Sequence, residues 1–272
     1  MLNNTYLKDY NFLLVTLDSL TYETAMNTET PNIKRWAEKY ENRTIEGTPF
    51  RKVYTQATFT LPSHVSMFFG LFPDNRRSRE PYYNRKLFKP VVFDRESDNR
   101  PQGLVFKSAP NMIKGFEHAG YNTSGVGGVG WFDTSSNSTN IWKEVFFQNF
   151  YYNKSFHETA KNSITAQAKC VSEIVTNDKG NKSFVFVNIS ATHSPYLYNG
   201  QPYALERFDD EFETFLAPFK SHRPLFLILV SDHGDVLSGA WEQYGQRHAF
   251  FVPERALEIM EIPMLIIDIH EW

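Results

Sequence analysis

Two kinds of apolar pattern alternate along the chain. Continuous apolar runs predict buried strands at 11–17, 183–188 and 225–230, and shorter runs predict strands at 53–55, 121–126 and 262–268, the last at a sheet edge. Apolar residues at helical spacing predict helices over 31–40, 62–70, 111–119, 157–175 and 204–219, whereas the polar residues 22–28 predict a loop. This alternation indicates an α/β fold, a three-layer sandwich with a mostly parallel central sheet flanked by helices.

Composition agrees with a single globular domain. The 272 residues are 41% hydrophobic, and neither a repeat nor a linker divides them, so we expect one domain over 1–272 without a separate C-terminal subdomain. The net charge of −3, with no dominant basic stretch, gives no indication of an obligate nucleic-acid partner. One cysteine, no recognisable signal peptide and no apolar run near the roughly 20 residues that span a bilayer predict a cytoplasmic protein without a membrane segment. The sequence gives no indication of the oligomeric state.

Two of the predicted buried strands run directly into acidic residues. The strand at 225–230 is followed by Asp232 and His233, and the strand at 11–17 is followed by Asp18. Ligands of open α/β sheets bind beyond the carboxyl ends of the strands, so these side chains are placed to hold a cation or a substrate. Two carboxylates and one imidazole suit a divalent cation, although Asp232-His233-Gly234 alone would favour a polar turn after a strand.

A third stretch adds a hydroxyl group. Thr60 stands just before Pro62 and Ser63, where a helix is expected to begin, and the free N–H groups of a helix start can bind an anion. A threonine at this place can attack a bound phosphate only if a metal or a base stabilises its alkoxide. The acids at the two strand ends, with His233, are the candidate ligands of that metal.

Six short motifs follow one another over most of the chain. They are Leu17-Asp18-Ser19-Leu20, Thr30-Pro31-Asn32, Thr60-Leu61-Pro62-Ser63-His64, Gly120-Tyr121-Asn122-Thr123, His193-Ser194-Pro195 and Asp232-His233-Gly234. In this order they resemble the sulfatase-like branch of the alkaline phosphatase superfamily. The resemblance implies a metal-dependent hydrolase or transferase that acts on small anionic phosphate, phosphonate or sulfate esters.

The resemblance also implies a nucleophile and a metal site. Thr60 is expected to be both the nucleophile and a metal ligand, with Asp18, Asp232 and His233 as the further ligands. Mn, Zn, Mg and Ca remain open as the divalent cation, because oxygen and imidazole donors do not choose among them. Two-metal relatives have an aspartate where this chain has Ile189, so one complete metal site is expected.

Three histidines are expected on the substrate side. By position in the motifs, His193 and His248 are candidates for substrate binding and for protonating the leaving oxygen. His64 is a further candidate for substrate binding, although sulfatases of this branch have an arginine there. Those sulfatases also have a cysteine or serine, oxidised to formylglycine, in place of Thr60. The only cysteine, Cys170, lies far from this motif, so the sequence favours phosphorus over sulfur.

A glycine-rich run offers a different interpretation. Residues 125–130 have the glycine spacing of a dinucleotide-binding turn, which would indicate an oxidoreductase. No helical periodicity follows, so these glycines more plausibly let the backbone approach the site or a neighbouring strand.

The leading functional hypothesis is therefore a metal-dependent hydrolase of phosphate monoesters, diesters or phosphonate esters that forms a covalent phosphothreonine. The alternatives are a sulfatase-like transferase, a sulfuric ester hydrolase and a non-catalytic protein that binds a phosphorylated ligand. The polar stretches 74–102 and 238–251 are expected to select the substrate.

Overall fold

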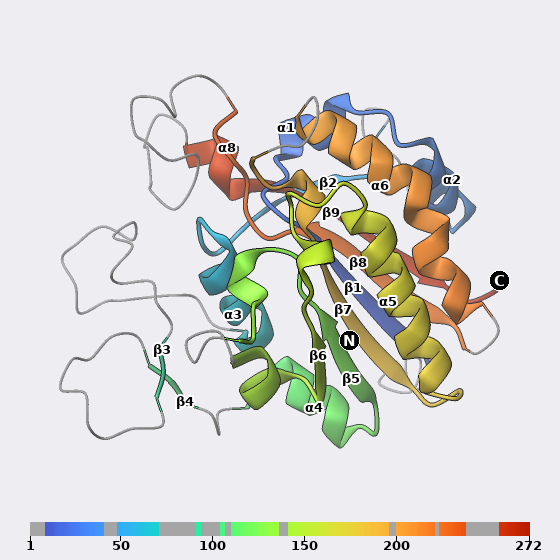
Figure 1. The fold of residues 1–272 in the computed structure, drawn as a ribbon. Coiled ribbons are helices and arrows are strands. Elements are labelled where there is room, and N and C mark those ends of the chain that lie inside the picture. The colour runs from blue at the N-terminus through green and yellow to red at the C-terminus, as the bar shows by residue number, and fades with distance from the viewer. Residues whose placement is uncertain are drawn as a thin grey trace.

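A seven-stranded sheet forms the centre of the molecule (Figure 1). The computed structural model describes residues 9–40, 48–70, 91–93, 104–106, 110–135, 141–195, 200–220, 223–237 and 256–272. In spatial order the strands are β2 (Arg51–Tyr54), β9 (Glu261–Ile269), β8 (Leu225–Ser231), β1 (Asn11–Leu17), β7 (Ser183–Ile189), β5 (Asn122–Val126) and β6 (Asn149–Tyr151). From β8 to β6 all neighbours are parallel, whereas β9 is antiparallel to both β8 and β2. A separate two-stranded sheet contains β3 (Val91–Phe93) and β4 (Leu104–Phe106).

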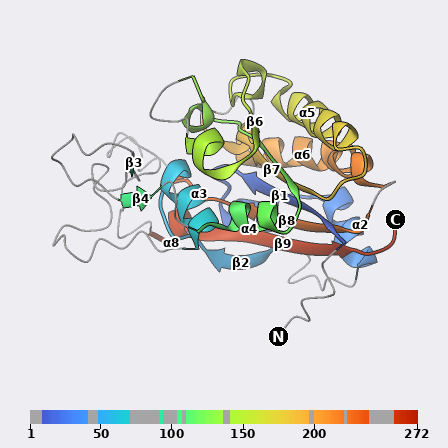
Figure 2. The same cartoon turned by 90° about the horizontal axis from the view of Figure 1, so that it is seen from below.

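Helices cover both faces of the central sheet, which confirms the predicted α/β class (Figures 1 and 2). One face carries α2 (Pro31–Lys39), α5 (Ser163–Asn177) and α6 (Gln201–Leu216), with α1 (Tyr22–Asn27) next to α6. The other face carries α3 (Thr60–Phe69) and α4 (Met112–His118). The remaining helical segments are α8 (Ala256–Met260), η1 (Gly130–Phe132), η2 (Trp142–Phe146), η3 (Lys154–Phe156), η4 (Ser190–Thr192) and η5 (Ala217–Phe219). Among the described residues, none of these helices combines the length and the apolarity needed to cross a membrane.

The two faces of the sheet have different packing partners. We call the α5 and α6 side the aliphatic face, because the strands contribute only aliphatic side chains to it: Leu13, Val15, Leu17, Val185, Val187, Ile189, Leu225, Leu227 and Leu229. We call the α3 side the aromatic face, because Phe186 of β7 makes ring contacts there with Phe68, Phe132 and Phe147, and Phe184 with Phe116. Trp142, Phe146 and Phe147 therefore belong to the core, whereas Tyr151 is exposed.

Several predicted boundaries are wrong. Residues 22–28 contain a helix instead of a loop, because the Thr21 side chain caps α1 by accepting a hydrogen bond from the Thr24 N–H (3.1 Å). The first helical residue of α3 is Thr60, two residues before the expected start. Helix α5 begins at Ser163, because turns occupy residues 157–162, the first part of the predicted helix.

The last strand is also placed differently from the prediction. Strand β9 lies between β2 and β8, so β2 is the edge strand. Pro263 of β9 pairs opposite Lys52 of β2, so this proline lies in the strand next to the edge strand.

Candidate active site

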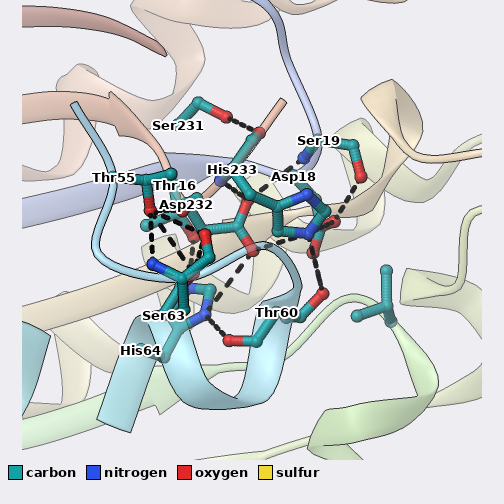
Figure 3. A network of polar contacts seen from close by, with 12 residues as sticks. Thr16, Asp18, Ser19, Thr55, Thr60, Ser63, His64, Ser231, Asp232 and His233 are labelled. Atoms are coloured by element: carbon teal, nitrogen blue, oxygen red, sulfur yellow. Dashed lines mark hydrogen bonds and ion pairs between the residues drawn. The ribbon is translucent and has the colours of Figure 1, made fainter. Parts of the chain in front are cut away.

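The carboxyl ends of β1 and β8 bring the predicted metal ligands together. The two strands are parallel neighbours with Leu17 opposite Ser231, so the residues that follow them lie side by side. Asp18, Asp232 and His233 are fully buried, and one ligand atom from each lies within 4.8 Å of the others. Figure 3 shows the three side chains turned toward one another.

Thr60 completes this group from the first turn of α3. Its Oγ1 atom lies 3.5 Å from Asp18 Oδ2 and 3.4 Å from His233 Nε2 (Figure 3). His233 Nε2 is also 3.7 Å from Asp18 Oδ1 and 3.5 Å from Asp232 Oδ2. Ligands at roughly 2.1 Å from one tetrahedral centre lie about 3.4 Å apart, so this spacing fits donors arranged around a single cation.

One oxygen of Asp232 supports the same interpretation. Asp232 Oδ1 accepts hydrogen bonds from the N–H groups of Ser19 (3.1 Å) and His233 (3.0 Å). Its Oδ2 is buried and has no hydrogen-bond partner among the described residues. Burial raises the pKa of Asp232, because the charged form loses its hydration. A buried carboxylate oxygen without a donor is costly, and a bound cation would offset that cost.

The carboxylate of Asp18 is held from two sides. Asp18 Oδ1 accepts a hydrogen bond from the Ser19 hydroxyl (3.1 Å), and Oδ2 accepts one from the Asn188 side-chain amide (2.9 Å). Ser19 adopts a left-handed backbone conformation with φ of 63°, which is uncommon for a residue with a side chain. This turn directs its N–H group to Asp232, so one residue contacts both acids.

The three predicted substrate-side histidines have different positions. His193 follows η4 just beyond the end of β7, and β7 is the parallel neighbour of β1, so His193 lies at the same edge of the sheet as Asp18. His64 is buried among the residues of the aromatic face. Its Nδ1 is 2.7 Å from the Thr60 carbonyl oxygen, and its Nε2 is 3.0 Å from Thr16 Oγ1. Because both ring nitrogens have protein partners, substrate binding by His64 stays a prediction. His248 and nearly all of the two predicted substrate-selecting stretches lie outside the described residues.

The glycine-rich run packs against the site, as predicted. A Cβ atom on Gly128 would lie 2.4 Å from the Asn188 carbonyl oxygen, so only glycine allows this approach. The Val129 N–H donates to Asn188 Oδ1 (3.4 Å). No helix of Rossmann type follows, because the next element is the three-residue η1.

Sequence reasoning missed Thr16. It lies opposite Asn188 in the pairing of β1 with β7, and its hydroxyl contacts both Asn188 and His64. The alternation of strand side chains could have revealed it, because Thr16 shares a face of β1 with Asp18.

The family model for sulfatases matches residues 10–272. The chain belongs to the sulfatase family. Solved structures agree with this membership in the alkaline phosphatase superfamily. A protein of that superfamily from Vibrio parahaemolyticus is 16% identical with a TM-score of 0.57, over 97% of this chain and 62% of the other.

Two further solved structures share the fold of this sulfatase-family chain. The C-terminal periplasmic domain of EptC from Escherichia coli, in complex with Zn, is 15% identical with a TM-score of 0.56, over 97% of this chain and 74% of the other. The lipoteichoic acid synthase LtaP from Listeria monocytogenes is 12% identical with a TM-score of 0.56, over 96% and 67%. No curated protein matches the sequence.

Proposed function

We propose that this sulfatase-family chain is a metal-dependent hydrolase of phosphate esters with Thr60 as its nucleophile. The observation that carries the proposal is the position of Thr60 Oγ1, 3.5 Å from Asp18 Oδ2 and 3.4 Å from His233 Nε2 at the start of α3. A phospho-ligand-binding protein needs no hydroxyl among its metal ligands, whereas a covalent mechanism does. The substrate would be a small anionic ester.

Asp18, Thr60, Asp232 and His233 would hold one divalent cation. The buried Asp232 Oδ2 without a donor supports this assignment, as does the zinc complex of the EptC domain. When bound, such a cation acts as a Lewis acid that lowers the pKa of a coordinated hydroxyl and neutralises charge on phosphoryl oxygens.

The residues of the chain then divide the reaction between them. Thr60 passes its hydroxyl proton to solvent water, from which His193 regains the proton it donates, and Thr60 Oγ1 attacks phosphorus in line, forming the new O–P bond while the bond to the leaving oxygen breaks. The first turn of α3 offers backbone N–H groups to the phosphoryl oxygens. His193 gives a proton to the leaving oxygen, so an alcohol departs. Water then attacks phosphorus, releases phosphate and restores the Thr60 hydroxyl.

Phosphorus rather than sulfur is supported by the position of the only cysteine. Cys170 of α5 packs against the aliphatic face, on the opposite side of the sheet from α3. It therefore cannot replace Thr60 as a formylglycine precursor. A transferase is the second candidate, because the similar LtaP structure is that of a synthase. In that case an acceptor alcohol would take the place of water.

A panel of nitrophenyl esters tests the proposal. Nitrophenol release is measured from nitrophenyl phosphate, bis-nitrophenyl phosphate, nitrophenyl phenylphosphonate and nitrophenyl sulfate, with Mn²⁺ or with a chelator. We expect Mn²⁺-dependent release from a phosphorus ester by the wild type, reduced by about 1,000-fold or more in Thr60→Ala. Thr123→Val is the matched control, because Thr123 is equally buried but its hydroxyl contacts Glu117 and Gln148.

Each contrary result points to a different error. Cleavage of the sulfate alone would overturn the choice of phosphorus. If Mn²⁺ binds and every ester stays intact, the non-catalytic binding protein becomes the better account. Full activity of Thr60→Ala would remove Thr60 from the mechanism.

A further inference from the structure

A continuous line of hydrogen bonds joins Asp18 to the backbone of Thr60 through three buried side chains. Asn188 Nδ2 lies 2.9 Å from Asp18 Oδ2 and 3.1 Å from Thr16 Oγ1. Thr16 Oγ1 lies 3.0 Å from His64 Nε2, and His64 Nδ1 lies 2.7 Å from the Thr60 carbonyl oxygen. We call Asn188, Thr16 and His64 the polar relay. None of the three has any exposed surface.

For a neutral His64 ring, the end groups set the direction of every bond in the polar relay. The Thr60 carbonyl oxygen can only accept, so His64 Nδ1 carries the hydrogen. In the neutral ring Nε2 is then an acceptor, and the Thr16 hydroxyl donates to it. Thr16 Oγ1 in turn accepts from Asn188 Nδ2, whose other hydrogen reaches Asp18. Each donor and acceptor is used once, so the network has no internal conflict.

Both outer parts of the polar relay are held by rigid surroundings. The Val129 N–H lies 3.4 Å from Asn188 Oδ1, which agrees with the amide orientation that turns its nitrogen toward Asp18. Gln167 Nε2 donates to the Asn188 carbonyl oxygen (2.5 Å). At the other end the His64 ring makes edge contacts with Phe132 and Phe186, at centroid distances of 5.1 and 5.3 Å. These contacts leave the imidazole little freedom to rotate.

We propose that the polar relay is a positioning device, which fixes the Asp18 carboxylate relative to the nucleophile-bearing first turn of α3. The proposal rests on the proposed function, since it assigns Asp18 and Thr60 to one metal site. Apart from the polar relay, the polar contact between Asp18 and α3 among the described residues is the one from Thr60 Oγ1 to Asp18 Oδ2, which at 3.5 Å is too long to fix the carboxylate. In this account His64 acts through the Thr60 backbone and does not contact substrate.

A purely structural role would affect stability alone, so the test separates stability from positioning. Thr16→Val removes the central hydroxyl at nearly unchanged shape, Thr16→Ser restores it, and Asn188→Leu removes the donor to Asp18. Thr123→Val serves again as the control. Each variant is characterised by thermal unfolding, by calorimetric titration with Mn²⁺, and by kcat and KM on the ester that the wild type cleaves.

We expect Asn188→Leu to bind Mn²⁺ about 10- to 100-fold more weakly, because groups that orient metal ligands contribute effects of this size. Thr16→Val should lower kcat by about 10-fold or more with KM changed by less than about twofold, because misplacing the nucleophile affects the chemical step. Thr16→Ser should regain the wild-type kcat within about twofold. Thr123→Val should have the wild-type kcat and Mn²⁺ affinity even where its stability is lower.

One measurement is independent of metal and of turnover. Nitrogen-15 NMR of the wild type should show His64 as the Nδ1-protonated tautomer with a slowly exchanging hydrogen, and Thr16→Val should keep this tautomer but shift the Nε2 resonance, because Nε2 loses the hydroxyl that donates to it. A different wild-type tautomer would overturn the polar relay. So would folded Thr16→Val and Asn188→Leu proteins with unchanged Mn²⁺ affinity and kcat. If the wild type cleaves no ester, the proposed function fails, while the tautomer and the Mn²⁺ affinities still decide the polar relay.

Discussion

The two faces of the central sheet have the same apolar alternation along most of β1 and β7 and differ at the ends of these strands. On the aliphatic face, Leu17 and Ile189 keep the pattern apolar to the last strand residue. On the aromatic face, the corresponding positions of β1 and β7 are Thr16 and Asn188, and Asp18 follows. The difference shows that a few polar positions at the strand ends are enough to form a site on one face. The side chains at the same strand ends on the other face remain apolar.

The same comparison explains why the site is buried. Aliphatic side chains on one face support the strands from which the acids project, while aromatic rings on the other face enclose His64 and exclude water from the polar relay. In such surroundings a satisfied polar network is stronger than in water, and a broken one is more costly. The predictions below test whether the two faces can be perturbed separately.

Truncation on the aliphatic face should have the largest effect on stability. Leu227 is fully buried there, and Leu227→Ala should lower the free energy of unfolding by about 2–5 kcal/mol through lost burial and a cavity. Well below the unfolding temperature its kcat should equal that of the wild type. Phe186→Leu on the aromatic face should lower kcat severalfold, because the Phe186 ring contacts His64. Urea unfolding and steady-state kinetics measure both quantities.

Metal binding is the next largest effect. Mn²⁺ at about 100 times its Kd should stabilise the wild type by about 2.7 kcal/mol, because it binds the folded state. Asp232→Asn should lose most of this gain, yet without metal at pH 7 it should unfold at a higher temperature than the metal-free wild type. The reason is that burial raises the pKa of Asp232, and the neutral amide removes an unfavourable buried charge.

The stability of the metal-free protein should depend on pH through Asp232. The folded protein holds the Asp232 proton more tightly than the unfolded chain does, so metal-free wild type should lose stability as pH rises from the ordinary aspartate pKa through the raised one. Asp232→Asn should lack this component. Thermal unfolding of both proteins in chelator across acid to neutral pH measures it, and parallel curves for the two proteins would contradict the account.

The glycine run offers a matched pair of smaller changes. In Gly128→Ala the new methyl group would lie 2.4 Å from the Asn188 carbonyl oxygen and 2.8 Å from Asn188 Oδ1. We expect a loss of about 1–3 kcal/mol in stability from this overpacking, together with a lower kcat. At Gly130 a Cβ would meet nothing within 4 Å, so Gly130→Ala should stay within about 0.5 kcal/mol of the wild type. Equal effects of the two substitutions would contradict the role given to Asn188.

The smallest expected effect concerns Cys170, whose side chain packs against the aliphatic face. Burial raises the pKa of Cys170 to about 11. At pH 8 the thiolate fraction is therefore small, and iodoacetamide should react far more slowly with the folded protein than with the urea-unfolded chain. The folded rate should rise toward pH 11 and should not respond to Mn²⁺. Rapid alkylation at pH 8 in the folded state would contradict this environment.

The sequence located the parts of the site that depend on local pattern. Acids directly after buried strands and a hydroxyl at a helix start are visible without knowing which strands are neighbours, so Asp18, Asp232, His233 and Thr60 were found. Contacts set by strand register were not visible. Thr16 meets Asn188 across 172 positions and His64 across 48, and only the pairing of β1 with β7 and the docking of α3 bring them together.

His64 shows the corresponding limit of reasoning from motifs. Its place in the Thr60 motif made it a candidate for substrate binding, although sulfatases have an arginine there. In the structure the His64 side chain points from α3 into the aromatic face. The periodicity of the helix alone does not indicate which aromatic rings it contacts there. Helix α1 was missed for a similar reason, since its cap depends on one hydroxyl of Thr21 rather than on an apolar pattern.

Mass spectrometry of the acid-quenched enzyme tests the central claim most directly. The wild type is mixed with Mn²⁺ and an excess of its nitrophenyl phosphorus ester, quenched in acid within the first turnovers and digested. We predict one added phosphoryl-type group on the Thr60 peptide, and none on that peptide in Thr60→Val. Nitrophenol release by the wild type with Thr60 unmodified, or with the group on another residue, would contradict the assignment of Thr60 as the nucleophile.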